Sequence, residues 1–138
     1  MTDNRILIAG AGPAGLVAAA ALAEEGIPIA IVEQARDLPD DLRASTFHPP
    51  TLDMLERFRD RHTGVIATFD HGVLKDDTRH PFRLQCEQWR LTRMLRDRLA
   101  QMPDVAFLYD ARAVEVAQDA DSVILTIERP DGSREPLR

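Results

Sequence analysis

Two short apolar runs near the N-terminus enclose a longer alanine-rich stretch. The runs cover Ile6–Ala9 and Ile29–Val32. Continuous apolar runs of this length are typical of strands buried on both faces of a parallel sheet. The stretch between them predicts a helix from Pro13 to about Glu25, which Gly26 would end in the left-handed conformation. The order strand, helix, strand predicts a right-handed βαβ unit.

The C-terminal half shows a second helical pattern followed by strand patterns. Leu91, Leu95 and Leu99 repeat every four residues and predict an amphipathic helix over residues 87–102. The apolar and alternating segments after it predict strands over residues 105–109, 113–117 and 122–128, with one more beginning near residue 135. With the βαβ unit, these elements predict an α/β fold. It would have a parallel sheet and a small added β-element.

The middle of the chain has weaker patterns. Residues 34–42 are rich in aspartate and predict an exposed loop. Apolar residues at helical spacing predict a third helix over residues 51–58. We expect one or two short strands within residues 64–81.

A glycine-rich hexad joins the first predicted strand to its helix, with the sequence Gly10-Ala11-Gly12-Pro13-Ala14-Gly15. The first glycine can leave the strand sharply, the second admits a pyrophosphate close to the backbone, and the third lets helix and strand pack closely. Proline suits the first helical position because no N–H is needed there. Free N–H groups and the helix dipole favour an anion at this end. The hexad therefore predicts a dinucleotide site.

Glu33 follows the second predicted strand directly. Its carboxylate can accept hydrogen bonds from both hydroxyls of an adenosine ribose, and it would repel a 2′-phosphate. The residue therefore favours FAD or NAD over NADP. The turn and Glu33 leave the choice between FAD and NAD open.

Composition and charge narrow the class of partner. The 138 residues suggest about one domain, and 44% hydrophobic with 29% charged residues is ordinary for a globular protein. The net charge of -6 argues against a nucleic-acid partner. Cys86 is the only cysteine, so no internal disulfide forms, which fits a reducing compartment. The N-terminus lacks a signal-peptide pattern and no apolar run is long enough to span a bilayer. We therefore expect a cytoplasmic protein without a nucleic-acid or membrane partner.

Other candidate chemistry is weak. The acidic residues Asp37, Asp40 and Asp41 are interpreted as a solvated loop, and the histidines at positions 48, 62, 71 and 80 lack zinc-ligand spacing. Ser45 and His48 lack a third partner and a nucleophile elbow, which argues against a hydrolase. We predict no metal site and assign no catalytic side chain.

Three segments resemble the FAD-dependent monooxygenases that hydroxylate aromatic rings, the group that includes para-hydroxybenzoate hydroxylase. The first runs from the glycine hexad through Glu33-Gln34-Ala35-Arg36. The second is the stretch from Arg43 through residue 55, an arginine followed by a loop and a helix. The third, Gln88-Trp89-Arg90-Leu91, is similar to the family's glutamine-led helix. The resemblance covers almost the whole chain.

This resemblance implies a role for each matching residue. Gly10, Ala11, Gly12, Pro13, Ala14 and Gly15 would lie against the FAD pyrophosphate. Glu33 would bind the adenosine ribose with Gln34 beside it, Arg43 would reach the pyrophosphate, and Gln88 would contact the ribityl region. In a complete relative, NAD(P)H reduces the FAD, and O2 then supplies the oxygen atom transferred to a small aromatic or similar substrate.

The same resemblance implies a Rossmann-like FAD/NAD(P)-binding fold that is incomplete. Residues 1–138 would form the N-terminal part of one FAD-binding domain, with residues 64–86 as a β excursion toward a substrate domain. Relatives continue into segments that hold the flavin end of the cofactor and most of the substrate domain, and we expect this chain to match their N-terminal portion only. We therefore expect the chain either to associate with itself or to depend on a missing C-terminal portion. Two alternatives stay open: a non-catalytic dinucleotide-binding fragment or accessory domain, and an NAD-dependent dehydrogenase.

Overall fold

The computed structural model describes residues 4–40, 46–47, 75–82 and 84–138. The chain divides into two compact units, one formed by Met1–Asp41 with Trp89–Arg138 and the other by Leu42–Gln88. The helix predicted over residues 51–58 and the segment 64–74 lie outside the described residues.

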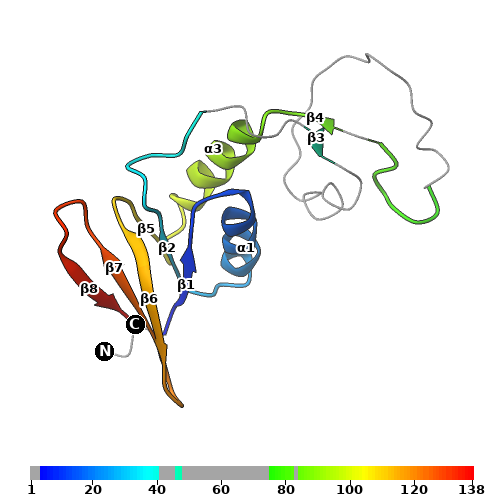
Figure 1. The fold of residues 1–138 in the computed structure, drawn as a ribbon. Helices are drawn as coiled ribbons and strands as arrows, with labels where there is room; N and C mark the ends of the chain where they lie inside the picture. The colour runs from blue at the N-terminus through cyan, green and yellow to red at the C-terminus, as the bar shows by residue number, and fades with distance from the viewer. Residues whose placement is uncertain (1–3, 41–45, 48–74, 83) are drawn as a thin grey trace. The chain divides into compact units, whose positions relative to one another are not determined.

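A parallel sheet forms the centre of the first unit (Figure 1). Its strands are β1 (Ile6–Ala9), β2 (Ile29–Val32) and β5 (Val105–Leu108), in the order β1-β2-β5. Both pairings are parallel, with Ile6 opposite Ile29 and Ile29 opposite Val105. The parallel sheet predicted from the sequence is confirmed, and β2 is its central strand.

Burial on both faces, which the apolar run of β1 predicts, is found in β2 and not in β1. All four residues of β2 are buried. In β1 both end residues are exposed, and Ile6 keeps 39% of its surface. The reason is position in the sheet, because β2 is the one hydrogen-bonded neighbour of β1 among the described strands. An apolar sequence shows that a strand favours burial, but it does not show whether another strand lies beside it to bury it.

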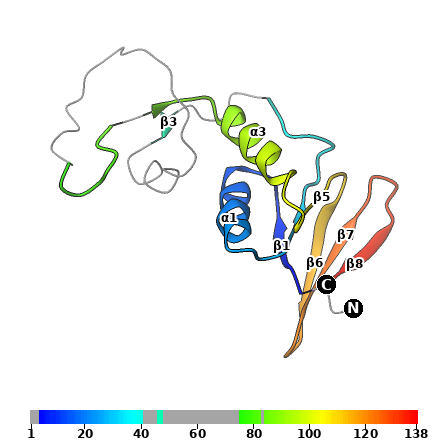
Figure 2. The ribbon, with the colours of Figure 1, turned by 180° about the vertical axis from the view of Figure 1, so that it is seen from behind.

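Helices lie on one face of the parallel sheet and a second sheet lies on the other (Figures 1 and 2). The helices are α1 (Pro13–Glu24) and α3 (Gln88–Leu99), within one to three residues of their predicted bounds. Successive side chains of a strand alternate between faces. Accordingly Ile8 lies toward Gly15 of α1, whereas Leu7 packs against the second sheet.

The second sheet consists of β6 (Arg112–Gln118), β7 (Val123–Glu128) and β8 (Arg134–Leu137). It is antiparallel in the order β6-β7-β8, and it is the small β-element predicted from the sequence. Its apolar face packs on the parallel sheet through a cluster of Val32, Ala111, Leu125 and Ile127, flanked by Leu7, Leu108 and Leu137.

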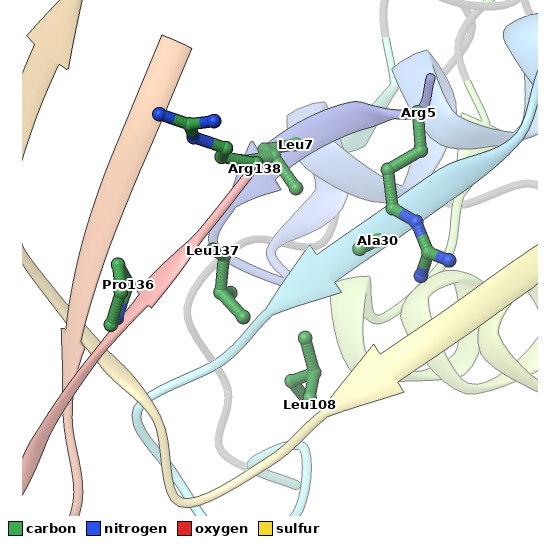
Figure 3. Close-up of a pocket in the computed structure, with 7 residues that line it drawn as sticks. All are labelled: Arg5, Leu7, Ala30, Leu108, Pro136, Leu137 and Arg138. Carbon is green, nitrogen blue, oxygen red and sulfur yellow. The ribbon is translucent and has the colours of Figure 1, made fainter. Parts of the chain in front are cut away.

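A pocket of about 260 Å³ opens between these two sheets (Figure 3). It is lined by Arg5, Leu7, Ala30, Leu108, Pro136, Leu137 and Arg138. The predicted cofactor residues Gly10–Gly15, Glu33 and Gln34 follow the carboxyl ends of β1 and β2, and none of them lines this pocket.

In the second unit, β3 (Thr46–Phe47) pairs antiparallel with β4 (Leu84–Gln85). His80 is buried there and meets the ring of Phe82 edge-on, with 5.5 Å between ring centroids. The strand β4 falls within residues 64–86, where a β excursion is predicted; the function of that segment stays a prediction.

Candidate cofactor site

The glycine turn between β1 and α1 has the geometry that its sequence predicts. Gly10 has a φ of +104°, in the left-handed region that glycine tolerates best, and its N–H donates to the Val32 carbonyl at 2.7 Å. A Cβ placed on Gly15 would lie 2.1 Å from the Gly10 carbonyl oxygen. The turn is therefore closed so tightly that only glycine fits at residue 15.

The N-terminus of α1 has backbone donors that precede its first helical hydrogen bond. Its first helical hydrogen bond runs from the Leu16 N–H to the Gly12 carbonyl at 2.9 Å, so the amides of Ala14 and Gly15 precede that bond. Gly12 occupies the cap position without a side-chain cap, Pro13 follows it, and the first turn carries no acidic residue. Nothing lies within 4 Å of a Cβ placed on Gly12. An uncapped helix end beside open space fits a pyrophosphate group.

Glu33 is fixed through its backbone. Its N–H donates to the Leu108 carbonyl at 2.8 Å, and its carbonyl accepts from the Ala111 N–H at 3.0 Å. The turn that returns from β5 passes through Asp110, which has a φ of +52°. Asp tolerates the left-handed region better than most residues. β5 and this turn therefore set the position of Glu33 at the end of β2.

The Glu33 carboxylate faces the glycine turn. Oε2 accepts the Ala11 N–H at 2.8 Å, and Oε1 accepts the Ala35 N–H at 2.9 Å. Ala11 is 1% exposed, while Glu33 is half-buried. The sequence predicted that Glu33 lies near the turn through a shared ligand, but it did not predict this direct contact. The second contact is local, because Ala35 lies two residues after Glu33.

Of the three remaining predicted cofactor residues, the structure describes Gln34 and Gln88. Gln34 is exposed directly after Glu33. Gln88 is the first residue of α3, is half-buried and belongs to the second unit. Arg43 lies outside the described residues. The cofactor roles of all three stay predictions.

In its described part, residues 34–40, the acidic loop after Glu33 is mostly exposed, as predicted, but it is also tied to α3. Arg93 Nε donates to Asp40 Oδ1 at 2.5 Å, and its Nη2 donates to the Leu38 carbonyl at 3.3 Å. Arg96 Nη1 lies 3.2 Å from Asp37 Oδ1. Leu38 is only 4% exposed, so the loop also has an apolar anchor. The charge pattern of the sequence does not predict this link, because the aspartates and arginines lie more than 50 residues apart.

These contacts shift the pKa values of the groups involved. The backbone N–H of Leu38 holds the pKa of the Asp37 carboxyl below its ordinary value of 3.8, and the nearby arginines lower it further. The hydrogen bond to Asp40 raises the pKa of the Arg93 guanidinium. Both groups therefore stay charged at neutral pH.

The described residues contain no group of three or more His, Cys, Asp and Glu that could hold a metal ion. Of the four histidines, only His80 is among them. Likewise, neither of the two described helices is both long and apolar enough to cross a bilayer.

Comparison with known sequences identifies longer relatives. The chain is 27% identical over 150 residues to para-nitrophenol 4-monooxygenase of Pseudomonas sp. strain WBC-3, covering 96% of this chain and 37% of the relative. It is 29% identical over 147 residues to 6-hydroxy-3-succinoylpyridine 3-monooxygenase HspB of Pseudomonas putida, covering 92% of this chain and 37% of that protein. The chain thus spans little more than a third of the length of these relatives.

Solved structures agree with the fold. The crystal structure of p-nitrophenol 4-monooxygenase PnpA from Pseudomonas putida DLL-E4 superposes with a TM-score of 0.82 at 27% identity, over 98% of this chain and 38% of that one. Aklavinone-11 hydroxylase, solved with FAD and aklavinone, shares the fold at a TM-score of 0.76 and 20% identity, over 97% of this chain and 31% of that one. The family model described as FAD binding domain matches residues 3–137. The resemblance to aromatic-ring flavoprotein monooxygenases is confirmed, and the chain belongs to this FAD-binding domain family.

Proposed function

We propose that this chain binds the adenosine and pyrophosphate part of FAD at the β1–α1 turn and at the end of β2. The observation that carries the proposal is the uncapped N-terminus of α1 beside open space at Gly12. Membership in the FAD-binding domain family supports FAD over NAD as the resident dinucleotide.

Each part of the site would make a different contact. The amides of Ala14 and Gly15 would donate to the pyrophosphate, and Gly12 would let it approach the backbone. Glu33 would accept hydrogen bonds from the ribose hydroxyls, with Gln34 at the rim. Arg43 would add a cation that pairs with two phosphate oxygens, and Gln88 would contact the ribityl region.

Bound flavin would supply the redox chemistry that the side chains of this chain lack. We propose that the complete protein is a monooxygenase that uses NAD(P)H and O2 to hydroxylate an aromatic or similar small molecule. The named relatives support this assignment, because para-nitrophenol 4-monooxygenase and PnpA are both aromatic monooxygenases. We place the protein in the cytoplasm, without a nucleic-acid or membrane partner, on the grounds of its net charge of -6 and its single cysteine.

A second candidate is a binding module without catalysis of its own. The chain spans 37% of the length of its relatives, which supports this reading for the 138 residues alone. Bound flavin without NAD(P)H-dependent O2 consumption would identify the module. Consumption of O2 with an aromatic substrate would identify an enzyme.

Titration of the purified chain with FAD, followed by quenching of flavin fluorescence, tests the proposal. We expect saturable quenching that NAD does not displace. Glu33→Arg should weaken binding at least about tenfold, because an acceptor of two charge-assisted hydrogen bonds becomes a donor. Glu115→Arg, at an exposed glutamate on β6, is the matched control and should leave the affinity unchanged. A chain that leaves flavin fluorescence unchanged contradicts the proposal, and tight NAD binding without FAD binding would indicate a dehydrogenase.

A further inference from the structure

The Glu33 carboxylate is already engaged by the protein before any ribose reaches it. Its two oxygens accept separate backbone amides, Ala11 from the glycine turn and Ala35 from the segment after β2. Both distances, 2.8 and 2.9 Å, are those of charge-assisted hydrogen bonds. A residue assigned only to ligand binding would have no need of either contact.

We propose that Glu33 is a positioning residue that assembles the glycine turn in the absence of cofactor. The carboxylate joins two segments 22 residues apart in the sequence, so it holds the turn against the end of β2. The value of this role for binding rests on the proposed function, whereas the role itself concerns the chain without ligand.

The backbone makes Glu33 suitable as an anchor. Its own N–H and carbonyl are bonded to Leu108 and Ala111 of the β5 segment, at 2.8 and 3.0 Å. The side chain therefore starts from a fixed point in the sheet. The turn, in contrast, has its nearest backbone bond at Gly10, to the Val32 carbonyl. Glu33 thus adds a second attachment at the next residue of the turn.

The same arrangement leaves capacity for the ligand. Each carboxylate oxygen has about two acceptor sites, and from the described residues each accepts one N–H. One site per oxygen is left, which matches the two adjacent hydroxyls of a ribose. The backbone amides fix the plane of the carboxylate, so those sites are oriented before binding and less ordering is needed on association.

The substitutions Glu33→Gln and Glu33→Ala distinguish a role in hydrogen bonding from a role in packing alone. An amide has one acceptor oxygen, so Glu33→Gln can satisfy one of the two N–H groups and faces the other with a donor. Glu33→Ala satisfies neither. We expect hydrogen exchange without FAD to accelerate at least about tenfold for one of the two amides in Glu33→Gln and for both in Glu33→Ala.

Nuclear magnetic resonance of the 138-residue chain provides the measurement. The amide proton shifts of Ala11 and Ala35 should move upfield in both variants, since each loses an anionic acceptor. Exchange at Ile31, in the buried centre of β2, reports whether a variant still folds. Glu115→Gln on exposed β6 is the control and should change neither amide. If the wild-type chain shows a through-hydrogen-bond coupling between the Ala11 nitrogen and the Glu33 carboxyl carbon, the contact is observed without any variant.

The outcomes separate this inference from the proposed function. Unchanged amide shifts and exchange in Glu33→Gln, with weakened FAD binding, would overturn the positioning role and leave a ribose contact only. Faster exchange with unchanged FAD affinity would support the positioning role and contradict the ribose contact. Absence of the coupling together with unchanged exchange in Glu33→Ala would also overturn it.

Discussion

Gly15 and Gly12 place opposite demands on the same short turn. A Cβ at residue 15 would lie 2.1 Å from the Gly10 carbonyl oxygen, a backbone atom that cannot move aside cheaply. A Cβ at residue 12 would meet nothing within 4 Å, and its φ of -72° suits any residue. One glycine is therefore required by the fold, and the other leaves space that the fold does not use.

We expect Gly15→Ala to destabilise the chain by about 1–3 kcal/mol, the usual range for overpacking a tight contact. Gly12→Ala should cost less than about 1 kcal/mol as a change at a helix cap, yet should weaken FAD binding because its methyl group enters the space in front of the helix end. Urea unfolding and FAD titration of both variants measure the two effects. Equal stability of the two variants would show that the turn relaxes and that the close contact is unimportant.

This pair also shows what could be predicted at the residue scale. The turn, the helix start and the position of Glu33 depend on residues close together in the sequence, so the sequence analysis predicted them. The contact between Glu33 and the Ala11 N–H was not predicted, because it joins residues brought together only when β1 and β2 pair. Backbone amides of alanine carry no sequence signal of their own.

Among the elements, α3 does more than cover the sheet. Arg93 and Arg96, on one side of the helix, bond Asp40 and Asp37 at sequence separations of 53 and 59 residues. Such pairs cannot be identified from charge patterns within the helix. They attach the segment after Glu33 to α3 and therefore limit how far that segment can move from the end of β2.

This attachment should weaken in acid. Because the pKa of Asp37 is lowered in the folded chain, its contribution is complete above the ordinary value of 3.8 and is lost as pH falls through the lower folded pKa. Titration of the Asp37 carboxyl carbon by nuclear magnetic resonance should give a midpoint below 3.8, with a parallel change at the Arg96 guanidinium. Asp37→Asn should abolish the change at Arg96. A midpoint at or above 3.8 would contradict the pairing in solution.

For the whole molecule, the order of the strands in the parallel sheet was the feature hardest to predict from the sequence. The patterns predicted most of the strands, yet the placement of β5 beside β2 depends on contacts across more than 70 residues. That placement leaves β1 at an edge of the sheet formed by the described strands. The sequence pattern of β1 is that of an interior strand, and this mismatch between pattern and position is a property of the assembled chain.

The edge of β1 has hydrogen-bonding groups on its outer side. Ile6 and Gly10 donate inward to the carbonyls of Pro28 and Val32. Since alternate residues of a strand point their N–H groups to opposite sides, Leu7 and Ala9 direct theirs outward. Exposed apolar edge strands readily pair with other chains.

We therefore expect the chain to self-associate as its concentration rises, and Ile6→Lys to reduce this association. Val116→Lys is the matched control, because Val116 is 67% exposed but lies on β6, an edge strand that carries a bulge and the charges of Arg112 and Glu115. Sedimentation velocity over a range of concentrations measures the effect. Equal suppression by both variants would show that general surface hydrophobicity, and not the β1 edge, drives association.

The exposed strand β1 also affects how the chain can be handled. β1 leads directly into the glycine turn, so any chain that pairs along its outer edge would lie close to Gly10. In concentrated samples the FAD-binding capacity should therefore fall as turbidity rises, and dilution should reverse both changes. Pairing along the four residues of β1 would then limit the concentration at which this polypeptide stays unassociated. A measurement of FAD binding would also report how far the chains have associated.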